Sequence, residues 1–214
     1  MPVTAPLSGK TIAFLVAQEG VEEVELTEPW RAVEKAGGTP KLVAPDAGEI
    51  LTFNHLDKSR AYNVDEALDV ADPGSYDALV LPGGVANPDK LRTDERAIEF
   101  IQGFAAAGKP VAAICHGPWT LVEADLVRGH RLTSWPSLKT DIRNAGGQWV
   151  DREVVVDKGL ISSREPDDLP AFCAAIVEEF ALGRRGPARL SGVPPAPAEQ
   201  VRTARQAGTV PGTP

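Results

Sequence analysis

Short, uninterrupted apolar runs constrain the fold of this chain more than any other feature of its sequence. Four of them have the length and composition of strands that are buried on both faces: Thr11 to Ala17, Lys41 to Ala44, Tyr76 to Leu81 and Val111 to Ile114. The segment from Val21 to Gly37 lies between the first two and places its apolar residues on one helical face. This β-α-β order predicts an α/β fold with a mostly parallel sheet and right-handed crossovers.

Further elements follow from local signals. Asn87 suits a helix N-cap and Pro88 the first helical turn, so we expect a helix there that continues from Glu95 to Ala107. The polar stretch from Asp46 to Asn63 is irregular, and both a surface hairpin and an interface element fit it. The other predicted elements are a helix from Pro118 to about Leu126, a closing helix from Leu169 to Leu182, and short strands at Arg131–Trp135, Gln148–Val150, Val154–Val156 and Leu160–Ser163.

The strand that ends at Ile114 is followed at once by Cys115, and Pro118 then suits the first turn of a helix. A nucleophile at such a strand-to-helix turn is pushed out of the sheet over the helix N-terminus. Unpaired N–H groups and the helix dipole favour a thiolate there, so we predict a depressed pKa for Cys115. His116 would add positive charge or accept the proton. The alternative is that Cys115 is a small buried residue at a tight corner.

Other polar residues follow the strands that precede this turn. Glu22, Glu23 and Glu25 come after the first strand, at the sheet edge where Cys115 also emerges. Acids in a first helical turn are commonly solvated, and we expect this of two of the three. Gly83 and Gly84 either form a plain turn or let backbone N–H groups approach an oxyanion. Asp89 either takes part in catalysis or stabilises its own helix.

Composition excludes several classes of function. The chain has 214 residues, a formal net charge of −8 and 43% hydrophobic residues, which argues against a basic nucleic-acid surface and suits one sizeable core. No run approaches the length of a membrane span, and nothing suggests export. Two distant cysteines in apolar settings indicate free thiols in a reducing cytoplasm. Three histidines and two cysteines give no zinc pattern, so we expect no metal.

The remaining cysteine and histidine have plain structural interpretations. Cys173 lies in an apolar helical run and is predicted to be core. His130 is predicted to lie in a loop that leads into a strand. From residue 184 to residue 214 the composition shifts to Pro, Gly and Ala, and we expect a disordered tail behind an α/β domain of residues 9–183.

These motifs in combination resemble the ThiJ/PfpI superfamily, and most closely its PfpI-like intracellular protease and general stress protein branch. The resemblance covers residues 9–183 and implies a flavodoxin-like sandwich similar to class I glutamine amidotransferases, in homodimers that can assemble further. The motifs that carry it are Glu22 to Glu25, Asp77-Ala-Leu-Val-Leu-Pro-Gly-Gly84, Asn87-Pro-Asp-Lys-Leu-Arg92, Gly108-Lys-Pro-Val111, Ala113-Ile-Cys-His-Gly-Pro118, Asn144-Ala-Gly146 and Glu153-Val-Val-Val-Asp157.

The resemblance also implies roles for individual residues. Cys115 corresponds to the family's nucleophile, with His116 beside it and Glu25 as the glutamate on a helix. Asp89 corresponds to the acid that completes the triad from a neighbouring subunit. Oxyanion-hole and pocket positions correspond to Gly83, Gly84, Gly117 and Trp119. Two departures stand out: many relatives carry Gln where this chain has Trp119, and some carry Glu at the position of Asp89.

The resemblance implies a cysteine-dependent hydrolase without a cofactor, of the deglycase or glyoxalase type, which acts on glyoxal or methylglyoxal adducts. A cysteine peptidase would use the same nucleophile on a larger acyl substrate. A redox-sensing or chaperone-like stress protein is the alternative outside enzymes, because a reactive thiol is also oxidisable. A glutamine amidotransferase is disfavoured, since no histidine follows His130.

Overall fold

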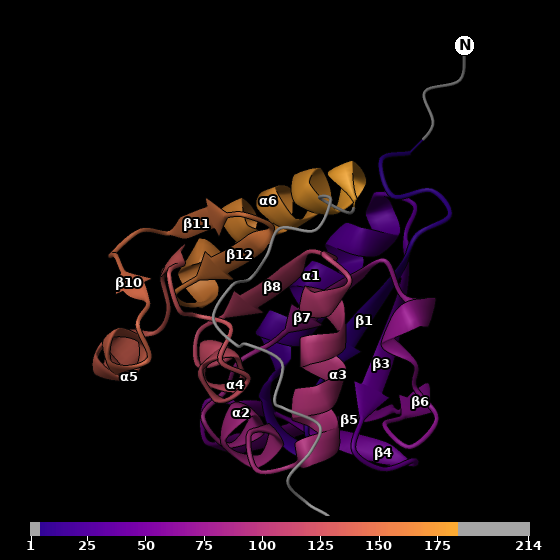
Figure 1. Cartoon of the computed structure of the whole chain (residues 1–214). Helices are drawn as coiled ribbons and strands as arrows, with labels where there is room; N and C mark the ends of the chain where they lie inside the picture. Colours follow the sequence, from indigo (N-terminus) through magenta and orange to yellow (C-terminus); the bar gives the residue numbers. More distant parts are fainter. Residues whose placement is uncertain (1–4, 184–214) are drawn as a thin grey trace, which may run out of the picture.

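The apolar runs form the centre of a seven-stranded sheet in the computed structural model, which describes residues 5–183 (Figure 1). The strand order is β11-β12-β8-β7-β1-β3-β6, and only the edge pair β11–β12 is antiparallel. The prediction of a mostly parallel α/β sheet is therefore confirmed. The strands are β1 Thr11–Leu15, β3 Thr39–Ala44, β6 Glu66–Ala67, β7 Ala78–Leu81, β8 Val111–Ile114, β11 Val154–Asp157 and β12 Leu160–Ser163.

Helices cover both faces of this sheet, because its strands alternate their buried side chains between two cores. In β1, Ala13 and Leu15 join one core, whereas Ile12 and Phe14 join the other. The first core lies under α3, α4 and α5, and the second under α1 and α6. The bounds are α1 Glu23–Lys35, α3 Glu95–Ala106, α4 Pro118–Glu123, α5 Lys139–Asn144 and α6 Leu169–Leu182, with short 3-10 turns at Pro73–Ser75, Pro136–Leu138 and Pro166–Asp168.

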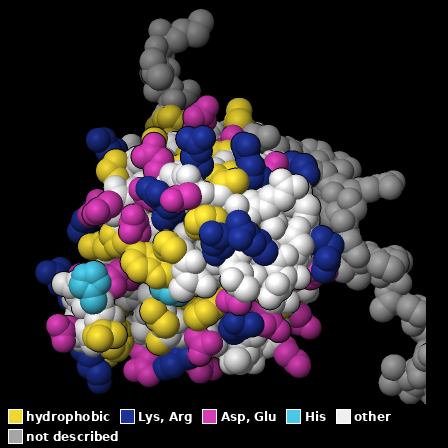
Figure 2. Space-filling model, turned by 90° about the vertical axis from the view of Figure 1, so that its left-hand side faces the viewer, with side chains coloured by type: hydrophobic (Ala, Val, Ile, Leu, Met, Phe, Trp, Pro, Cys, Tyr) yellow, Lys and Arg dark blue, Asp and Glu magenta, His cyan; other side chains and the backbone are white. Residues whose placement is uncertain are grey.

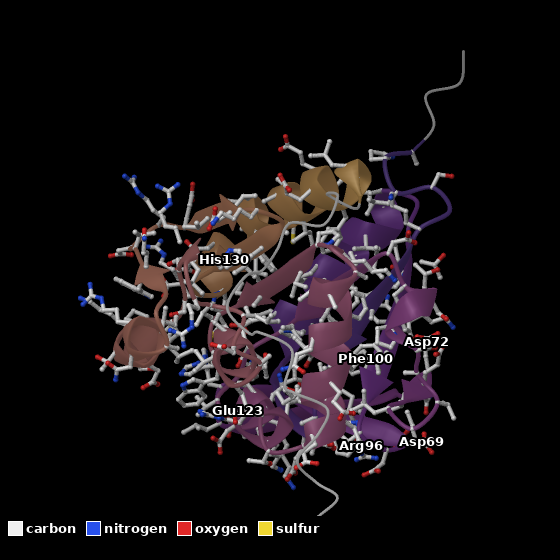
Figure 3. The ribbon with its side chains drawn as sticks, in the orientation of Figure 1. Asp69, Asp72, Arg96, Phe100, Glu123 and His130 are labelled. Carbon is white, nitrogen blue, oxygen red and sulfur yellow. The ribbon has the colours of Figure 1, made fainter. Side chains whose placement is uncertain are left out.

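Aromatic side chains from α3 and the sheet fill the first core. Phe100, labelled on α3 in Figure 3, lies 5.2 Å from Phe104 and 5.8 Å from Tyr76 between ring centres, both with edge-to-face geometry. Tyr76 immediately precedes Asp77 and the strand β7, so these rings fix α3 against the strand whose end leads to Gly83 and Gly84.

Two smaller sheets lie outside the central one. In the first, β2 (Glu19–Glu22) pairs parallel with β4 (Glu49–Asn54), which pairs antiparallel with β5 (Asp57–Asn63). Of the two possibilities for Asp46 to Asn63, the hairpin is therefore confirmed. The residues before Glu23 form β2 rather than the start of α1. In the second, β9 (Arg131–Leu132) pairs with β10 (Gln148–Trp149).

The prediction of Asn87 as an N-cap is wrong. Asn87 lies inside the short helix α2 (Ala86–Leu91), and its fully buried side chain makes tertiary hydrogen bonds instead. Its Oδ1 accepts from the Ala17 amide at 2.7 Å, and its Nδ2 donates to the carbonyls of Pro82 and Gly83 at 3.0 Å. The helix stops at Leu91, and α3 begins anew with Asp94 as its N-cap, so the single predicted helix is two. The helix α4 likewise ends at Glu123, short of Leu126.

His130 and Cys173 end in different surroundings. His130 lies in the loop before β9, as predicted, and it is buried, with Nδ1 3.2 Å from Asp157 Oδ2 of β11 (Figure 3). Cys173 is only half-buried and lines a groove between α1 and α6, so the prediction of a core position is wrong. The apolar stretch around it faces the sheet with other residues, Phe172 and Ile176.

The face drawn in Figure 2 carries acidic and basic side chains interleaved, with hydrophobic ones between them. Within residues 5–183, no helix has the length and apolar character needed to cross a bilayer. The predicted tail, residues 184–214, lies outside the described residues.

Candidate active site

Cys115 sits in a strained turn at the end of β8. Its φ is +60°, a left-handed conformation that costs a residue other than glycine about 1–3 kcal/mol. Its amide donates to the Ser163 carbonyl at 3.1 Å, and its carbonyl accepts from the Trp135 amide at 2.9 Å. Gly117 completes the turn, because a Cβ there would lie 2.4 Å from the Leu81 carbonyl oxygen. The backbone is thus held on both sides in the conformation that presents the thiol.

Glu25 reaches the same point from the first turn of α1. Only 1% of the residue is exposed, and its Oε2 accepts from the Gly83 amide at 2.9 Å. A Cβ at Gly83 would lie 2.4 Å from this oxygen and 2.7 Å from the Cys115 Cβ, so only glycine lets the two side chains meet. The other oxygen, Oε1, is buried without a well-aligned donor among residues 5–183.

Burial raises the pKa of both the carboxyl and the thiol. Burial raises the pKa of Glu25 to about 7 and repulsion from Glu22 adds to this, while contact with the thiol and the Gly83 and Gly84 amides opposes it. Burial, followed by the Glu25 charge, raises the pKa of the Cys115 thiol far above its usual value. The predicted depression of the Cys115 pKa is therefore wrong: α4 is only six residues long, and its N-terminus does not outweigh a buried acid.

His116 lies beside the thiol as a neutral ring. Its Nδ1 is 3.2 Å from the Cys115 Sγ, and its Nε2 is 3.4 Å from the Ser137 Oγ. Burial lowers the pKa of His116 to about 4, so the imidazole carries no charge near pH 7. Its ring stacks on Trp135, with 5.8 Å between ring centres. Two roles were possible for His116, proton acceptor and cation. A neutral ring is consistent only with the role of proton acceptor.

A cavity of about 210 Å³ opens over these groups. Four of the predicted site residues line it: Cys115, His116, Glu25 and Gly84. Gly83 does not line the cavity, and its amide donates a hydrogen bond to Glu25. The amides next to the Cys115 sulfur are those of Gly84 and His116. The other lining residues are Glu22, His55, Leu56, Val85, Trp135 and Pro166.

The remaining predicted residues lie outside the cavity wall. Trp119 supports His116 from behind, with 5.5 Å between ring centres, and its Nε1 donates to Asp141 at 2.8 Å. Gly117 serves the turn. Asp89 is exposed on α2 and does not line the cavity of its own chain. The structure therefore assembles a thiol, a carboxyl group and an imidazole within one chain, while the contribution of Asp89 from a neighbouring subunit stays a prediction.

About half of the residues that line the cavity are not predicted from the sequence. Glu22 was visible in the acidic run, but only the pairing of β2 with β4 shows that it is buried beside Glu25. His55 and Leu56 come from the hairpin tip, and Trp135 from the loop after β9. No local signal marks them, because their positions depend on that strand pairing and on the Trp135 backbone bond to Cys115. Within residues 5–183, no group of three or more His, Cys, Asp or Glu side chains is arranged to hold a metal ion.

Comparisons with known proteins agree with this architecture. Residues 10–179 match the family model described as DJ-1/PfpI family. Protein/nucleic acid deglycase 2 of Escherichia coli K12 is 43% identical over 164 residues, which cover 76% of this chain and 93% of that protein. "Putative cysteine protease YraA" of Bacillus subtilis 168 is 42% identical over 163 residues, 76% of this chain and 94% of that protein. The structure of Drosophila melanogaster DJ-1beta has a TM-score of 0.74 at 27% identity, covering 82% of this chain and 91% of that one.

Proposed function

Because this chain belongs to the DJ-1/PfpI family, we propose that it is a cofactor-independent cysteine hydrolase of the deglycase or glyoxalase type, which acts on methylglyoxal or glyoxal adducts. The observation that carries the proposal is the buried pair of Glu25 and Cys115 at the floor of the cavity. A carboxyl whose pKa is raised to about 7 is suited to accept a proton near neutral pH and to return it.

The raised thiol pKa and the contact between the two side chains support Glu25 as the general base. As the Cys115 sulfur attacks the carbon that carries the hydroxyl and amino groups of the adduct, Glu25 accepts the thiol proton. The carbon–nitrogen bond breaks and the proton passes to the leaving nitrogen. The product is a free amine and a hemithioacetal on Cys115. The amides of Gly84 and His116, which lie next to the sulfur, would donate to oxygen at the reacting carbon.

The second half of the reaction needs no external oxidant. A base removes the proton from the carbon bonded to sulfur, and the adjacent carbonyl carbon is protonated, so one carbon is oxidised while its neighbour is reduced. The neutral His116, 3.2 Å from the sulfur, and Glu25 are the groups placed to move this proton. Water then cleaves the thioester. In sum, an adduct and one water give an amine and a hydroxy acid.

The size of the cavity favours a small substrate. About 210 Å³ lies below the range of roughly 300–1,000 Å³ that is common for pockets of drug-sized ligands, and it suits a three-carbon adduct at the end of a side chain. A peptidase would need an extended groove on both sides of Cys115. We therefore place the peptidase second, supported by the name of the Bacillus subtilis relative.

The test is turnover of methylglyoxal adducts by the full chain, with the hydroxy acid and the free amine measured by mass spectrometry. We expect both products from the wild type and from Cys173→Ala, and neither from Cys115→Ala. Equal yields with wild type and Cys115→Ala would reject a cysteine mechanism. Cleavage of peptides without turnover of adducts would favour the peptidase. A Cys115 that only oxidises with mild peroxide, without turnover of any substrate, would favour a redox sensor.

A further inference from the structure

The imidazole of His116 connects the floor of the cavity with the outside of the chain. The ring lines the cavity, and its Nδ1 lies 3.2 Å from the Cys115 Sγ. The other nitrogen, Nε2, lies 3.4 Å from the Oγ of Ser137, an exposed residue that does not line the cavity. Contacts of this kind are commonly long before substrate binds and shorten in the complex. The thiol, the ring and the hydroxyl therefore form a continuous row from the buried sulfur to solvent.

A neutral imidazole is suited to pass a proton along such a row. One of its nitrogens carries a hydrogen, and the other accepts one. Burial lowers the pKa of His116 to about 4, so a proton that reaches the ring stays there only briefly before the ring releases another. A serine hydroxyl both accepts and donates. The Ser137 Oγ is therefore able to take the proton that leaves Nε2 and to give its own hydrogen to water.

The His116 ring is held in the orientation that this transfer needs. It contacts two tryptophans, Trp135 with 5.8 Å and Trp119 with 5.5 Å between ring centres. The Trp135 amide donates to the Cys115 carbonyl at 2.9 Å, and the Trp119 Nε1 donates to the Asp141 Oδ2 at 2.8 Å. Because both tryptophans are anchored, a half-turn of the imidazole is hindered. Nδ1 therefore stays directed at the sulfur.

A bound substrate closes the direct route by which protons reach the reacting pair. Cys115 and Glu25 are both buried, and both line the cavity of about 210 Å³. While the cavity is empty, water that enters it exchanges protons with both groups. A three-carbon adduct fills much of this volume and excludes the water. The proposed reaction moves protons in this closed state, and the row through His116 and Ser137 is a route that the adduct leaves open.

We propose that His116 and Ser137 form a proton path between the Cys115–Glu25 pair and solvent, which operates while an adduct fills the cavity. Nδ1 accepts a proton from the sulfur, Nε2 releases one to the Ser137 Oγ, and the hydroxyl gives its own hydrogen to water. One proton leaves, no electron moves, and the reverse transfer restores the first tautomer of the ring. Ser137 acts through His116 rather than on the substrate, so it is a positioning residue. The inference rests on the proposed function, because it concerns the reaction of the same site.

The first experiment follows one hydrogen from the substrate into the product. The full chain turns over a methylglyoxal adduct in D₂O, and proton NMR measures the hydrogen on the carbon of the hydroxy acid that carries the hydroxyl group. A sample without enzyme corrects for exchange in the substrate itself. In the wild type, the proton removed from the carbon bonded to sulfur exchanges with solvent through the path, so we expect mainly deuterium at this position.

Ser137→Ala interrupts the path, because the hydroxyl is lost. We expect its product to retain mainly protium, since the removed proton stays in the closed site until it is returned to the neighbouring carbon. We also expect kcat to fall by about tenfold, as for the loss of one hydrogen bond. Ser137→Thr keeps a hydroxyl at the same position and should restore both values.

The matched control is Thr140→Ala. Thr140 is also exposed and lies on α5, so this variant removes a surface hydroxyl from the adjoining element. We expect it to keep the wild-type deuterium content and kcat. The proposal is overturned if the wild-type product retains protium, if Ser137→Ala gives as much deuterium as the wild type, or if Thr140→Ala lowers the deuterium content as much as Ser137→Ala does.

A measurement on the thiol separates this inference from the proposed function. Alkylation of Cys115 by iodoacetamide at pH 7 to 8 also requires the thiol proton to leave while a reagent occupies the cavity, and it needs no turnover. We expect Ser137→Ala to slow this alkylation by about tenfold, while Ser137→Thr and Thr140→Ala keep the wild-type rate. The other free thiol, Cys173, should be unaffected in every variant.

The two failures are distinguishable. If no adduct is turned over while the alkylation of Cys115 follows this pattern, the proposed function fails and the proton path stands. If adducts are turned over but Ser137→Ala alkylates at the wild-type rate, only the proton path fails.

Discussion

Deprotonation of both Cys115 and Glu25 is unfavourable, because the two groups are neighbours. Two negative charges in a shielded corner repel each other, so the pair releases one proton near pH 7 and holds the second far more strongly. The pair therefore carries one charge over a wide pH range, and the thiol reacts by handing its proton to the carboxylate at the moment of attack. This arrangement differs from a permanent thiolate at a helix N-terminus.

Glu25→Gln is expected to affect reactivity and turnover in opposite directions. Without the carboxylate, the Cys115 pKa falls towards its usual range, and alkylation by iodoacetamide at pH 7 to 8 becomes faster than in the wild type. Turnover of adducts should fall by about 10²–10⁴-fold, because the general base is gone. Peptide mass spectrometry measures both thiols in one sample, with Cys173 as the internal control. Slower alkylation of Cys115 in the variant would contradict the charge repulsion.

The same residue makes stability depend on pH. The pKa of Glu25 is about 7 in the folded chain and near 4.5 in an ordinary setting, so between these values the folded chain binds a proton that the unfolded chain lacks. Stability from this group is present at low pH and is lost as pH rises from 4.5 to 7. At about 1.4 kcal/mol per pKa unit, the loss is roughly 3 kcal/mol.

Urea unfolding at pH 5 and pH 8 measures this loss. We expect Glu25→Gln to gain up to about 3 kcal/mol relative to the wild type between the two conditions. His116 acts in the opposite sense, because its pKa is lowered from 6.5 to about 4 and its stability contribution is lost as pH falls. Since both proteins contain His116, its effect cancels in the comparison. Parallel pH profiles would mean that Glu25 titrates normally.

At the scale of elements, Asn87 connects the ends of two central strands. Its side chain links the residues after β1, at Ala17, with the turn after β7, at Pro82 and Gly83. The same turn supplies the Gly83 amide, which donates a hydrogen bond to the Glu25 carboxyl. Three hydrogen bonds from one fully buried side-chain amide thus fix the distance between the end of β1 and the glycine turn.

Asn87→Ala is expected to destabilise the fold by about 2–4 kcal/mol, because buried donors and acceptors lose their partners. Turnover should fall in the fraction that stays folded, since the Gly83 turn loses its link to the residues after β1. Asn87→Asp keeps the acceptor for the Ala17 amide and loses the two hydrogen bonds donated to Pro82 and Gly83. It therefore distinguishes the contribution of the β1 end from that of the turn after β7. Thermal unfolding and kcat at a temperature well below the midpoint measure the effects. Wild-type values in both variants would show that the link is dispensable.

The sequence predicts the central elements well and the site only in part. The runs at Val111–Ile114, Leu160–Ser163 and Leu169–Leu182 appear with the predicted bounds, because strands buried on both faces and apolar helices have strong local patterns. Asn87 is not a cap, and its sequence does not reveal this, since an asparagine before Pro88 has the same local pattern whether it caps a helix or is buried. The direction of the Cys115 pKa shift is not predictable from the sequence for a related reason: burial by residues distant in the chain decides it, and no local pattern records that burial.

At the scale of the whole molecule, the exposed Asp89 raises the question of assembly. It does not line the cavity of its own chain, while the apolar and exposed Val85 and Leu56 do. The family resemblance predicts that Asp89 completes the site of a partner subunit. Such a two-fold dimer would hold two composite sites. Alternatively, Asp89 only stabilises the start of α2, worth about 0.3–1 kcal/mol.

Mixing two inactive variants distinguishes these roles. If Asp89 acts across an interface, a heterodimer of Asp89→Ala and Cys115→Ala contains one site with both residues intact. We expect recovery of up to about a quarter of the wild-type activity after random subunit exchange, since half of the dimers are mixed and each has one intact site. Native mass spectrometry confirms the exchange. Confirmed mixed dimers without activity, or full activity of Asp89→Ala alone, would reject the shared site.

The left-handed backbone of Cys115 has a practical consequence for engineering this chain. Glycine would occupy a φ of +60° without strain. Replacing Cys115 by glycine would therefore relax the backbone, but it would remove the side chain that the proposed chemistry requires. A library screened only for heat resistance would therefore enrich proteins without the nucleophile. Selection for thermostable variants of this chain should score catalysis in the same round, because here the two properties favour different residues.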